Sequence, residues 1–404
     1  MTELLWLLIP LAAASGWYAA IRTTKKCSER SASLIPDEYI KGLNFLLNEQ
    51  PDKALEVFIR IVEVDSDTVE THIVLGNLFR RRGEVERAIR IHQNLVVRRN
   101  LSLALRANAL LELGRDYLRA GLLDRAESVL KEVVQMGGQA TQAYRHLRDI
   151  YEQEKDWTNA IETAVRLHKE CGVPQGEVIA HYHCELGELA IADGRYDAAF
   201  QHAKKALNYD RACARASILL GDLAASKADY KAAIKFYSDV HAQRQEFVPL
   251  VLPKLEHAHA MRSDDNGYLN LLARIRTDNN SMSVALSMVK CLKRKAPNAL
   301  DEVFAVEFSR PLVPLRLIRE YVRAKLESDG QTNPVLHHIA GALDSHLECL
   351  TSHLCLRCGL ETKGLFWQCP SCHRWSTIMP IDLACGARKL SRAQNDVKTS
   401  HGPI

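Results

Sequence analysis

A regular placement of small residues in the middle of the chain restricts its fold more than any other feature. Alanine recurs in six segments, each time twelve residues after a reference position that is glycine in five segments and arginine in one. The reference positions are Gly42, Gly76, Gly114, Arg148, Gly187 and Gly221, and the alanines are Ala54, Ala88, Ala126, Ala160, Ala199 and Ala233. The reference positions are 34, 38, 34, 39 and 34 residues apart. Such a period predicts helical pairs that stack on copies of themselves.

Helix packing gives this pattern a physical reason. Antiparallel helices approach closely only where side chains are small, so we expect the glycine of each first helix to meet the alanine of the second. Seven residues after the reference position, Gly83, Gly121 and Gly194 predict the turn between the two helices. The longer steps of 38 and 39 residues predict longer connections near Arg98–Leu103 and Gly172–Glu177.

The pattern resembles the tetratricopeptide repeat family, which implies a superhelix whose concave face grips another protein. Residues 35–245 hold the six units, although the proline that usually closes each unit is missing. Residues 246–350 are expected to add two or three degenerate pairs, with Leu255 as a seventh reference position. The helices expected after that pair are Ser283–Lys293, Leu300–Phe308, Leu315–Leu326 and Pro334–Leu350.

The N-terminus predicts a membrane anchor within residues 1–21. Leu4–Ile21 is a run of 18 residues without a charge, near the lower limit for a helix that spans a bilayer. A basic linker at residues 22–34 follows it, with Arg22, Lys25, Lys26 and Arg30. Positive charge on this side predicts a single-pass anchor with the body of the chain in the cytoplasm.

Two Cys-x-x-Cys motifs near the C-terminus predict one metal ion. Cys355, Cys358, Cys369 and Cys372 have the spacing at which four thiolates surround a common centre. We therefore expect residues 351–385 to form a small rubredoxin-like or zinc-ribbon module, followed by a tail at residues 386–404. Zinc is favoured and iron stays possible, since a rubredoxin uses the same paired arrangement for iron. Four protein ligands leave no open position, which favours a structural site over a catalytic one.

Other candidate ligands and sites are weaker. His353 or His373 would replace a cysteine only in an alternative ligand set. His181 and His183 stand two apart on a predicted helix and point away from each other, so we expect solvated or groove-lining side chains rather than ligands. The same geometry applies to the pair His257 and His259. The run of three arginines at positions 80–82 ends a predicted helix, either as a solvated terminus or as a patch for an acidic partner or lipid headgroups.

The sequence does not predict an enzyme or a nucleic-acid binder. It carries no phosphate-binding glycine loop, no G-x-S-x-G motif and no H-E-x-x-H motif, so we assign no catalytic residue and expect no small-molecule substrate. The formal net charge is only +4, whereas nucleic-acid-binding domains are usually more basic and more clustered in charge. A zinc-ribbon nucleic-acid binder and a redox module stay open as alternatives.

The order of anchor, repeats and cysteine module resembles the lipopolysaccharide assembly protein B (LapB) family of Gram-negative bacteria over essentially the whole chain. The resemblance implies a non-catalytic adaptor in the inner membrane with its body in the cytoplasm. It implies that the adaptor brings the lipid A deacetylase LpxC to the membrane protease FtsH, and that an inner-membrane sensor restrains it. Partners in the lipopolysaccharide assembly machinery are also implied. A generic envelope-assembly scaffold with a different client is the main alternative.

Overall fold

The structure is a computed structural model of the chain, and it divides into two compact units at residue 154. It describes residues 37–380 apart from positions 49, 65–68, 100, 279–280, 296–298, 310–312, 314, 329–332 and 350–351. The predicted anchor at residues 1–21, the basic linker and the predicted tail lie outside the described residues. Within the described ranges, no helix is both long and apolar enough to cross a membrane.

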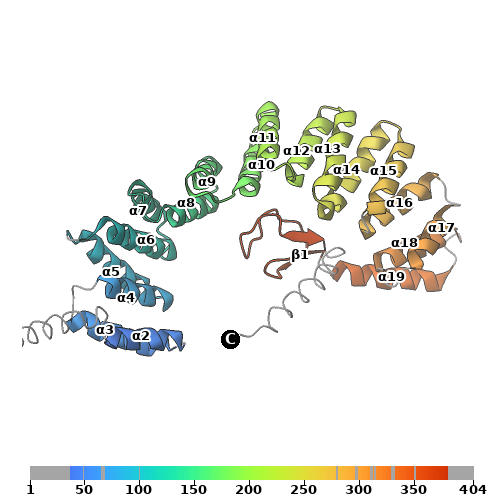
Figure 1. Cartoon of the computed structure of the whole chain (residues 1–404). Coiled ribbons are helices and arrows are strands. Elements are labelled where there is room, and N and C mark those ends of the chain that lie inside the picture. Colours follow the sequence, from blue (N-terminus) through green and yellow to red (C-terminus); the bar gives the residue numbers. More distant parts are fainter. Residues whose placement is uncertain are drawn as a thin grey trace, which may run out of the picture. The chain divides into compact units, whose positions relative to one another are not determined.

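The first unit consists of helices that pack as successive antiparallel pairs (Figure 1). These helices are α2 (Asp37–Leu47), α3 (Pro51–Val64), α4 (Val69–Arg81), α5 (Val85–Val97), α6 (Leu103–Arg119), α7 (Leu123–Gln135) and α8 (Ala140–Glu154). The first helices of neighbouring pairs, α4, α6 and α8, contact one another and form one face of this unit.

The second unit continues the helical pairs and ends in a small sheet. It begins with the helices α9 (Trp157–Cys171), α10 (Gly176–Ala192), α11 (Tyr196–Tyr209), α12 (Ala214–Ser226) and α13 (Tyr230–Gln243). The short helix η2 (Gln245–Phe247) precedes α14 (Val248–Met261), α15 (Asp265–Asp278), α16 (Met282–Lys295), α17 (Leu300–Phe308), α18 (Leu315–Ser328) and α19 (Pro334–Cys349). The strands are β1 (His353–Cys355), β2 (Glu361–Thr362) and β3 (Ile378–Pro380). The four helices predicted after residue 280 are thus confirmed, and three degenerate pairs follow residue 245.

The repeated alanines are buried in the helical core. Each of the six has no exposed surface. Four of the five glycines lie against a larger side chain instead, and for these four the prediction is wrong. At Gly187 the Cβ position does lie 3.6 Å from the backbone oxygen of Ala199, beside Leu219. A Cβ atom placed on Gly42 would meet Phe58, one on Gly76 would meet His92, and one on Gly114 would meet Leu130. Each of these partners lies one helical turn after the alanine, so a glycine on the first helix makes room for a large side chain of the second.

The turn predicted seven residues after the reference position is also confirmed. Gly83, Gly121 and Gly194 adopt left-handed backbone conformations, with φ between 74° and 84°. Lys155 and Ala228 take the same position in their units and adopt φ of 58° and 57° without glycine's freedom. The left-handed turn therefore does not depend on glycine.

The seventh pair is present, but its register differs from the prediction. Its left-handed turn residue is Ser263, which follows the predicted reference residue Leu255 by eight positions instead of seven. Both Leu255 and Ala258 are buried in the core of the second unit.

The longer connections predicted for two of the repeats are not found. The link from α5 to α6 spans residues 98–102 and the link from α9 to α10 spans residues 172–175, about as long as the other links. The additional residues instead lengthen α6 and α10, which have 17 residues each, whereas α4 and α12 have 13 each. Four residues make about one helical turn, so the insertion extends a first helix at its N-terminus and preserves the face that packs.

Candidate metal centre and its docking surface

A three-stranded antiparallel sheet holds the cysteine motifs in place. Strand β1 is central, with β2 on one side and β3 on the other. Leu354 pairs with Glu361 in β2 and with Met379 in β3, and Cys355 pairs with Ile378. The first cysteine is therefore part of the central strand. The sheet is small, and its core consists of Cys355, Cys369 and Ile378 with three partly buried neighbours.

The two Cys-x-x-Cys motifs form two separate loops with the same backbone conformation. The N–H of Gly359 donates to the carbonyl of Cys355, and the N–H of His373 donates to the carbonyl of Cys369, both at 2.9 Å. Gly359 and His373 both adopt left-handed conformations, with φ of 78° and 53°. Histidine adopts this region more readily than most residues other than glycine. His373 thus completes the second loop as Gly359 completes the first.

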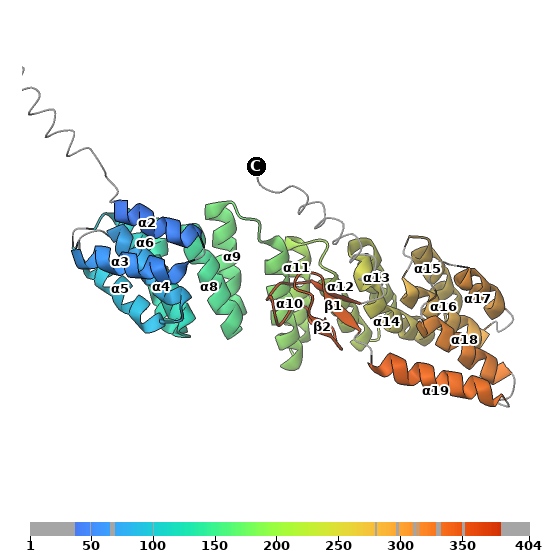
Figure 2. The ribbon, with the colours of Figure 1, turned by 90° about the horizontal axis from the view of Figure 1, so that it is seen from below.

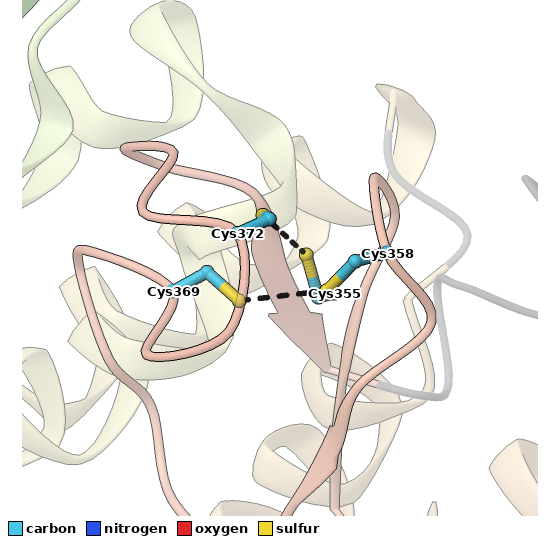
Figure 3. Close-up of side chains that lie close together, drawn as sticks. All are labelled: Cys355, Cys358, Cys369 and Cys372. Atoms are coloured by element: carbon cyan, nitrogen blue, oxygen red, sulfur yellow. Dashed lines mark hydrogen bonds between the residues drawn. The ribbon is translucent and has the colours of Figure 1, made fainter. Parts of the chain in front are cut away.

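The loops bring four sulfur atoms together from two directions (Figure 3). All four lie within 4.8 Å of one another. The Cys355 and Cys372 sulfurs are 3.8 Å apart, and the Cys358 and Cys369 sulfurs are 3.7 Å apart. A tetrahedron of sulfurs about 2.3 Å from a central ion has edges of about 3.8 Å, while a disulfide bond needs about 2.05 Å. The spacing therefore fits four ligands of one ion and does not fit a disulfide.

The thiols have different acidities because their surroundings differ. Burial raises the pKa of Cys355, but the Thr377 hydroxyl and the N–H groups of Arg357 and Cys358 outweigh it and bring this pKa down to about 6. Burial raises the pKa of Cys369 to about 12, and its sulfur contacts add to that increase. Four adjacent thiolates repel one another, so a positive ion is needed at their centre for all four to be deprotonated.

The chemistry of this cluster defines the metals that fit it. Four thiolates in tetrahedral order suit zinc or iron, and these distances do not separate the two. Among the described residues, these four cysteines form the group of metal-ligating side chains close enough to share an ion, and neither His353 nor His373 belongs to it. The nitrogen Nδ1 of His353 instead lies 2.8 Å from the Ser352 hydroxyl.

The metal module packs against the helices of its own unit. Both views place its strands beside α10 and α12 (Figure 1, Figure 2). The ring of His181 in α10 stacks on Trp375, with the centroids 4.9 Å apart and the planes 14° apart. His181 Nε2 also lies 2.8 Å from the Ser376 hydroxyl. Trp375 in turn meets the edges of Trp157 and Tyr182.

A second contact lies at α12 and extends this interface. The guanidinium of Arg215 lies 5.7 Å from the ring centre of Trp367 and 6.0 Å from that of Trp375. Two ion pairs, each of 2.8 Å, hold Arg215 to Glu185 and Glu188 of α10. A cation on an aromatic face is most favourable where water is excluded, and Arg215 is only 4% exposed. The helices therefore bind the two tryptophans of the module through the ring of His181 and the ion-paired guanidinium of Arg215.

The roles of the histidines differ from the sequence prediction in part. His181 and His183 are buried, so the prediction of solvated side chains is wrong, although neither belongs to a metal group. Burial and then the charge of Arg215 lower the pKa of His181 to about 3, so its ring is neutral where it stacks on Trp375. His183 points elsewhere and stacks on Tyr209. His259 packs against Tyr268 and also contributes to the helical core.

The two histidines of α10 give a matched test of this docking. We expect His181→Ala to weaken the contact by about 2 kcal/mol, because a ring stack and a hydrogen bond are lost. Amides of residues 367–378 would then exchange about thirtyfold faster with solvent, since every 1.4 kcal/mol is a factor of ten. Hydrogen exchange followed by mass spectrometry measures this effect, and metal content should not change.

His183→Ala is the control for that experiment. It removes a similarly buried ring from the same helix but touches no part of the metal module, so exchange in residues 367–378 should stay as in the parent chain. Equal acceleration by both substitutions would contradict the assigned role of His181, and so would loss of metal from the His181→Ala chain.

The arginine run at positions 80–82 fits the interpretation as a solvated helix end only in part. Arg80 is only 17% exposed and forms ion pairs with Glu112 and Asp116 of the neighbouring first helix α6. Arg81 is exposed, and Arg82 forms long contacts with Asp52 and Glu84. The first arginine therefore has a structural role, which the run of three identical residues did not reveal.

Comparison with known proteins identifies similar domains and similar whole chains. A family model described as a rubredoxin metal binding domain matches residues 353–380. Tetratricopeptide repeat models match residues 71–104, 111–172 and 184–245. Lipopolysaccharide assembly protein B of Escherichia coli (strain K12) is 33% identical over 383 residues, which is 94% of this chain and 98% of that protein.

Further matches extend this comparison. The protein with the same name from Haemophilus influenzae (strain ATCC 51907 / DSM 11121 / KW20 / Rd) is 29% identical over 391 residues, again covering 94% of this chain and 98% of the relative. Among solved structures, the MamA protein overlaps 45% of this chain and 94% of its own, with 20% identity and a TM-score of 0.30.

Proposed function

Because this chain belongs to the lipopolysaccharide assembly protein B family, we propose that it serves lipopolysaccharide assembly as a non-catalytic adaptor. The observation that carries the proposal is 33% identity over 94% of the chain to a protein of that name. The family match includes both the repeats and the metal module, so it covers the parts that the adaptor role requires.

The metal module acts in this proposal as a structural clasp. Cys355, Cys358, Cys369 and Cys372 would hold one ion, for which we propose zinc. When bound, such an ion supplies a cross-link between two loops that have almost no hydrophobic core of their own. In the folded module, Trp367 and Trp375 pack on Phe247, His181 and Arg215 of the helices.

The adaptor itself needs no reactive group. A repeat array that binds a client and lies beside a protease raises the local concentration of that client without new chemistry. We propose that the client is the deacetylase LpxC, that the protease is FtsH, and that the predicted anchor at residues 1–21 holds the chain in the inner membrane. The faces of the helical pairs would bind the proteins, and an inner-membrane regulator would control the complex.

Affinity purification from membranes tests this proposal. The chain carries a C-terminal tag, is captured from detergent-solubilised membranes, and the bound proteins are identified by mass spectrometry. We expect enrichment of both FtsH and LpxC over a control bait that has the same predicted anchor but an unrelated cytoplasmic domain. Absence of both proteins would contradict the proposed client and would favour a scaffold for another envelope protein.

A further inference from the structure

An open cleft of about 530 Å³ lies on the first unit, on the face formed by the first helices. Its lining comes from three consecutive pairs: α4 contributes Arg80 and Arg81, and α8 contributes His146. Helix α6 contributes Arg115, Leu118 and Arg119. Four guanidinium groups thus meet around one recess, far from the cysteine module in the sequence and in a different compact unit.

Arg80 forms the floor of the cleft and is held in place by buried acidic side chains. Arg80 donates through Nη2 to Glu112 Oε2 and Asn77 Oδ1, both at 2.6 Å, and through Nη1 to Asp116 Oδ1 at 2.7 Å and the Glu112 carbonyl at 3.1 Å. The second oxygen of Asp116 contacts the buried ring of His92. The N–H groups on both terminal nitrogens of Arg80 therefore already have acceptors. Arg80 forms the floor of the cleft but offers none of these groups to a ligand.

Arg115 and His146 form one wall of the cleft, and only some of the hydrogen-bond donors of this wall have acceptors. Arg115 donates to Glu112 Oε1 at 2.6 Å, to the Gln142 side chain, and through Nε to His146 Nε2 at 3.2 Å. Five donors minus these three leave two N–H groups on Arg115. Because Nε2 of His146 accepts, its proton is on Nδ1, and burial followed by the charge of Arg115 lowers the pKa of this ring and keeps it neutral.

The rim carries two guanidinium groups that have no partner among the described residues. Arg81 and Arg119 are exposed, and neither forms a hydrogen bond or ion pair with any residue that the structure describes. Each stands in the last turn of its helix, α4 or α6. Both oxygens of Glu112 and of Asp116 are occupied in the floor, so the charged groups of the cleft offer donors and no free carboxylate acceptor.

A recess with surplus donors and two unpaired cations is complementary to carboxylates, which guanidinium groups bind through paired hydrogen bonds. We propose that this cleft binds an extended acidic segment of a partner protein, with its carboxylates on Arg81, Arg119 and the free N–H groups of Arg115. Leu118 provides apolar contact for the stems of the bound side chains.

The observations favour a peptide over other polyanions. The floor arginine is recessed between helices, where a flat bilayer surface reaches poorly, whereas an extended chain follows a groove across successive helical pairs. Bases of single-stranded nucleic acid need aromatic platforms, and the cleft lining contains no aromatic residue other than the histidine ring. The proposal goes beyond the adaptor function, since it rests on the cleft alone and does not depend on the identity of the client.

Fluorescence anisotropy with the purified full-length chain tests this proposal. The probe is a fluorescent glutamate-rich peptide, with a glutamine-rich peptide of the same length as the comparison. We expect the glutamate peptide to bind and the glutamine peptide not to bind. The double substitution Arg81→Ala/Arg119→Ala should weaken binding about tenfold or more, because two charge-assisted contacts are lost.

Arg90→Ala/Arg125→Ala is the matched control, since it removes the same charge from exposed arginines on the second helices α5 and α7. Binding by this variant should equal that of the parent chain. Equal weakening by both double variants would overturn the proposal in favour of general attraction by net charge. Failure of the glutamate peptide to bind would also overturn it, and so would capture of phosphatidylglycerol vesicles through Arg81 and Arg119 that the peptide does not displace.

Discussion

The double substitution Cys369→Ser/Cys372→Ser is expected to remove the metal from the chain and to unfold residues 353–380. Two of four ligands are lost, and a structural zinc ion contributes about 10–16 kcal/mol to the folding of a small module. Elemental analysis of the purified chain should fall from one ion per chain to none. The emission of Trp367 and Trp375 should shift to the red as their rings leave the interface with α10 and α12.

Function and membrane attachment provide the second readout of that variant. We expect the chain to stay in the membrane fraction and to lose its ability to support growth in a strain that depends on it. Cys171→Ser is the control, because this partly exposed thiol lies outside the metal group, and it should keep metal, emission and function. Full complementation by the double variant would contradict the structural role of the ion.

Gly221→Ala should destabilise the second unit by about 3 kcal/mol, whereas Gly341→Ala should stabilise the chain. The new Cβ atom at position 221 would lie 2.3 Å from the ring of Tyr237, which is buried and donates a hydrogen bond to Asp222. Overpacking of this kind costs about 1–3 kcal/mol, and loss of the hydrogen bond adds about 1 kcal/mol.

At Gly341 the same Cβ atom meets nothing within 4 Å. Replacing glycine by alanine inside helix α19 then gains about 0.5–1 kcal/mol through helix propensity alone. Chemical denaturation of the second unit, followed through the tryptophan emission, measures both effects. The same sign for the two substitutions would contradict the close approach of α12 and α13 at Gly221.

The repeat and the cysteine motifs could be predicted because each depends on local spacing. Small residues that recur twelve residues apart within each repeat define the helical pairs, and the six alanines are fully buried. The spacing of the cysteines similarly predicted that four sulfur atoms lie close together. In both cases the chemistry of the residues and a short stretch of sequence contain the whole signal.

The residue that lies opposite the glycine was mispredicted in four of the helical pairs, for a geometric reason. A side chain on a helix leans toward the N-terminus and covers the turn before its own Cα. The side chain that reaches the space opposite Gly76 therefore belongs to His92, four residues after Ala88. The alanine permits the close approach, and the larger residue one turn later fills the space beside the glycine.

The docking of the metal module could not be predicted from the motifs, because it joins residues far apart in the chain. One signal was present in α10. His181, Glu185 and Glu188 follow each other at the spacing of one helix face, and together they form the polar surface against Trp375 and Arg215. Considered in pairs, His181 and His183 indicated only that they do not share an ion. A polar stripe on an otherwise apolar helix was the better indicator of a partner surface.

The rate at which FtsH degrades LpxC in reconstituted liposomes tests the adaptor function most directly. Purified protease, deacetylase and the metal-loaded full-length chain are combined, and intact deacetylase is followed with time. The proposed function predicts that degradation is slow without the chain, faster when the chain is added, and slow again with the Cys369→Ser/Cys372→Ser chain. A degradation rate that is the same with and without the metal-loaded chain would contradict it.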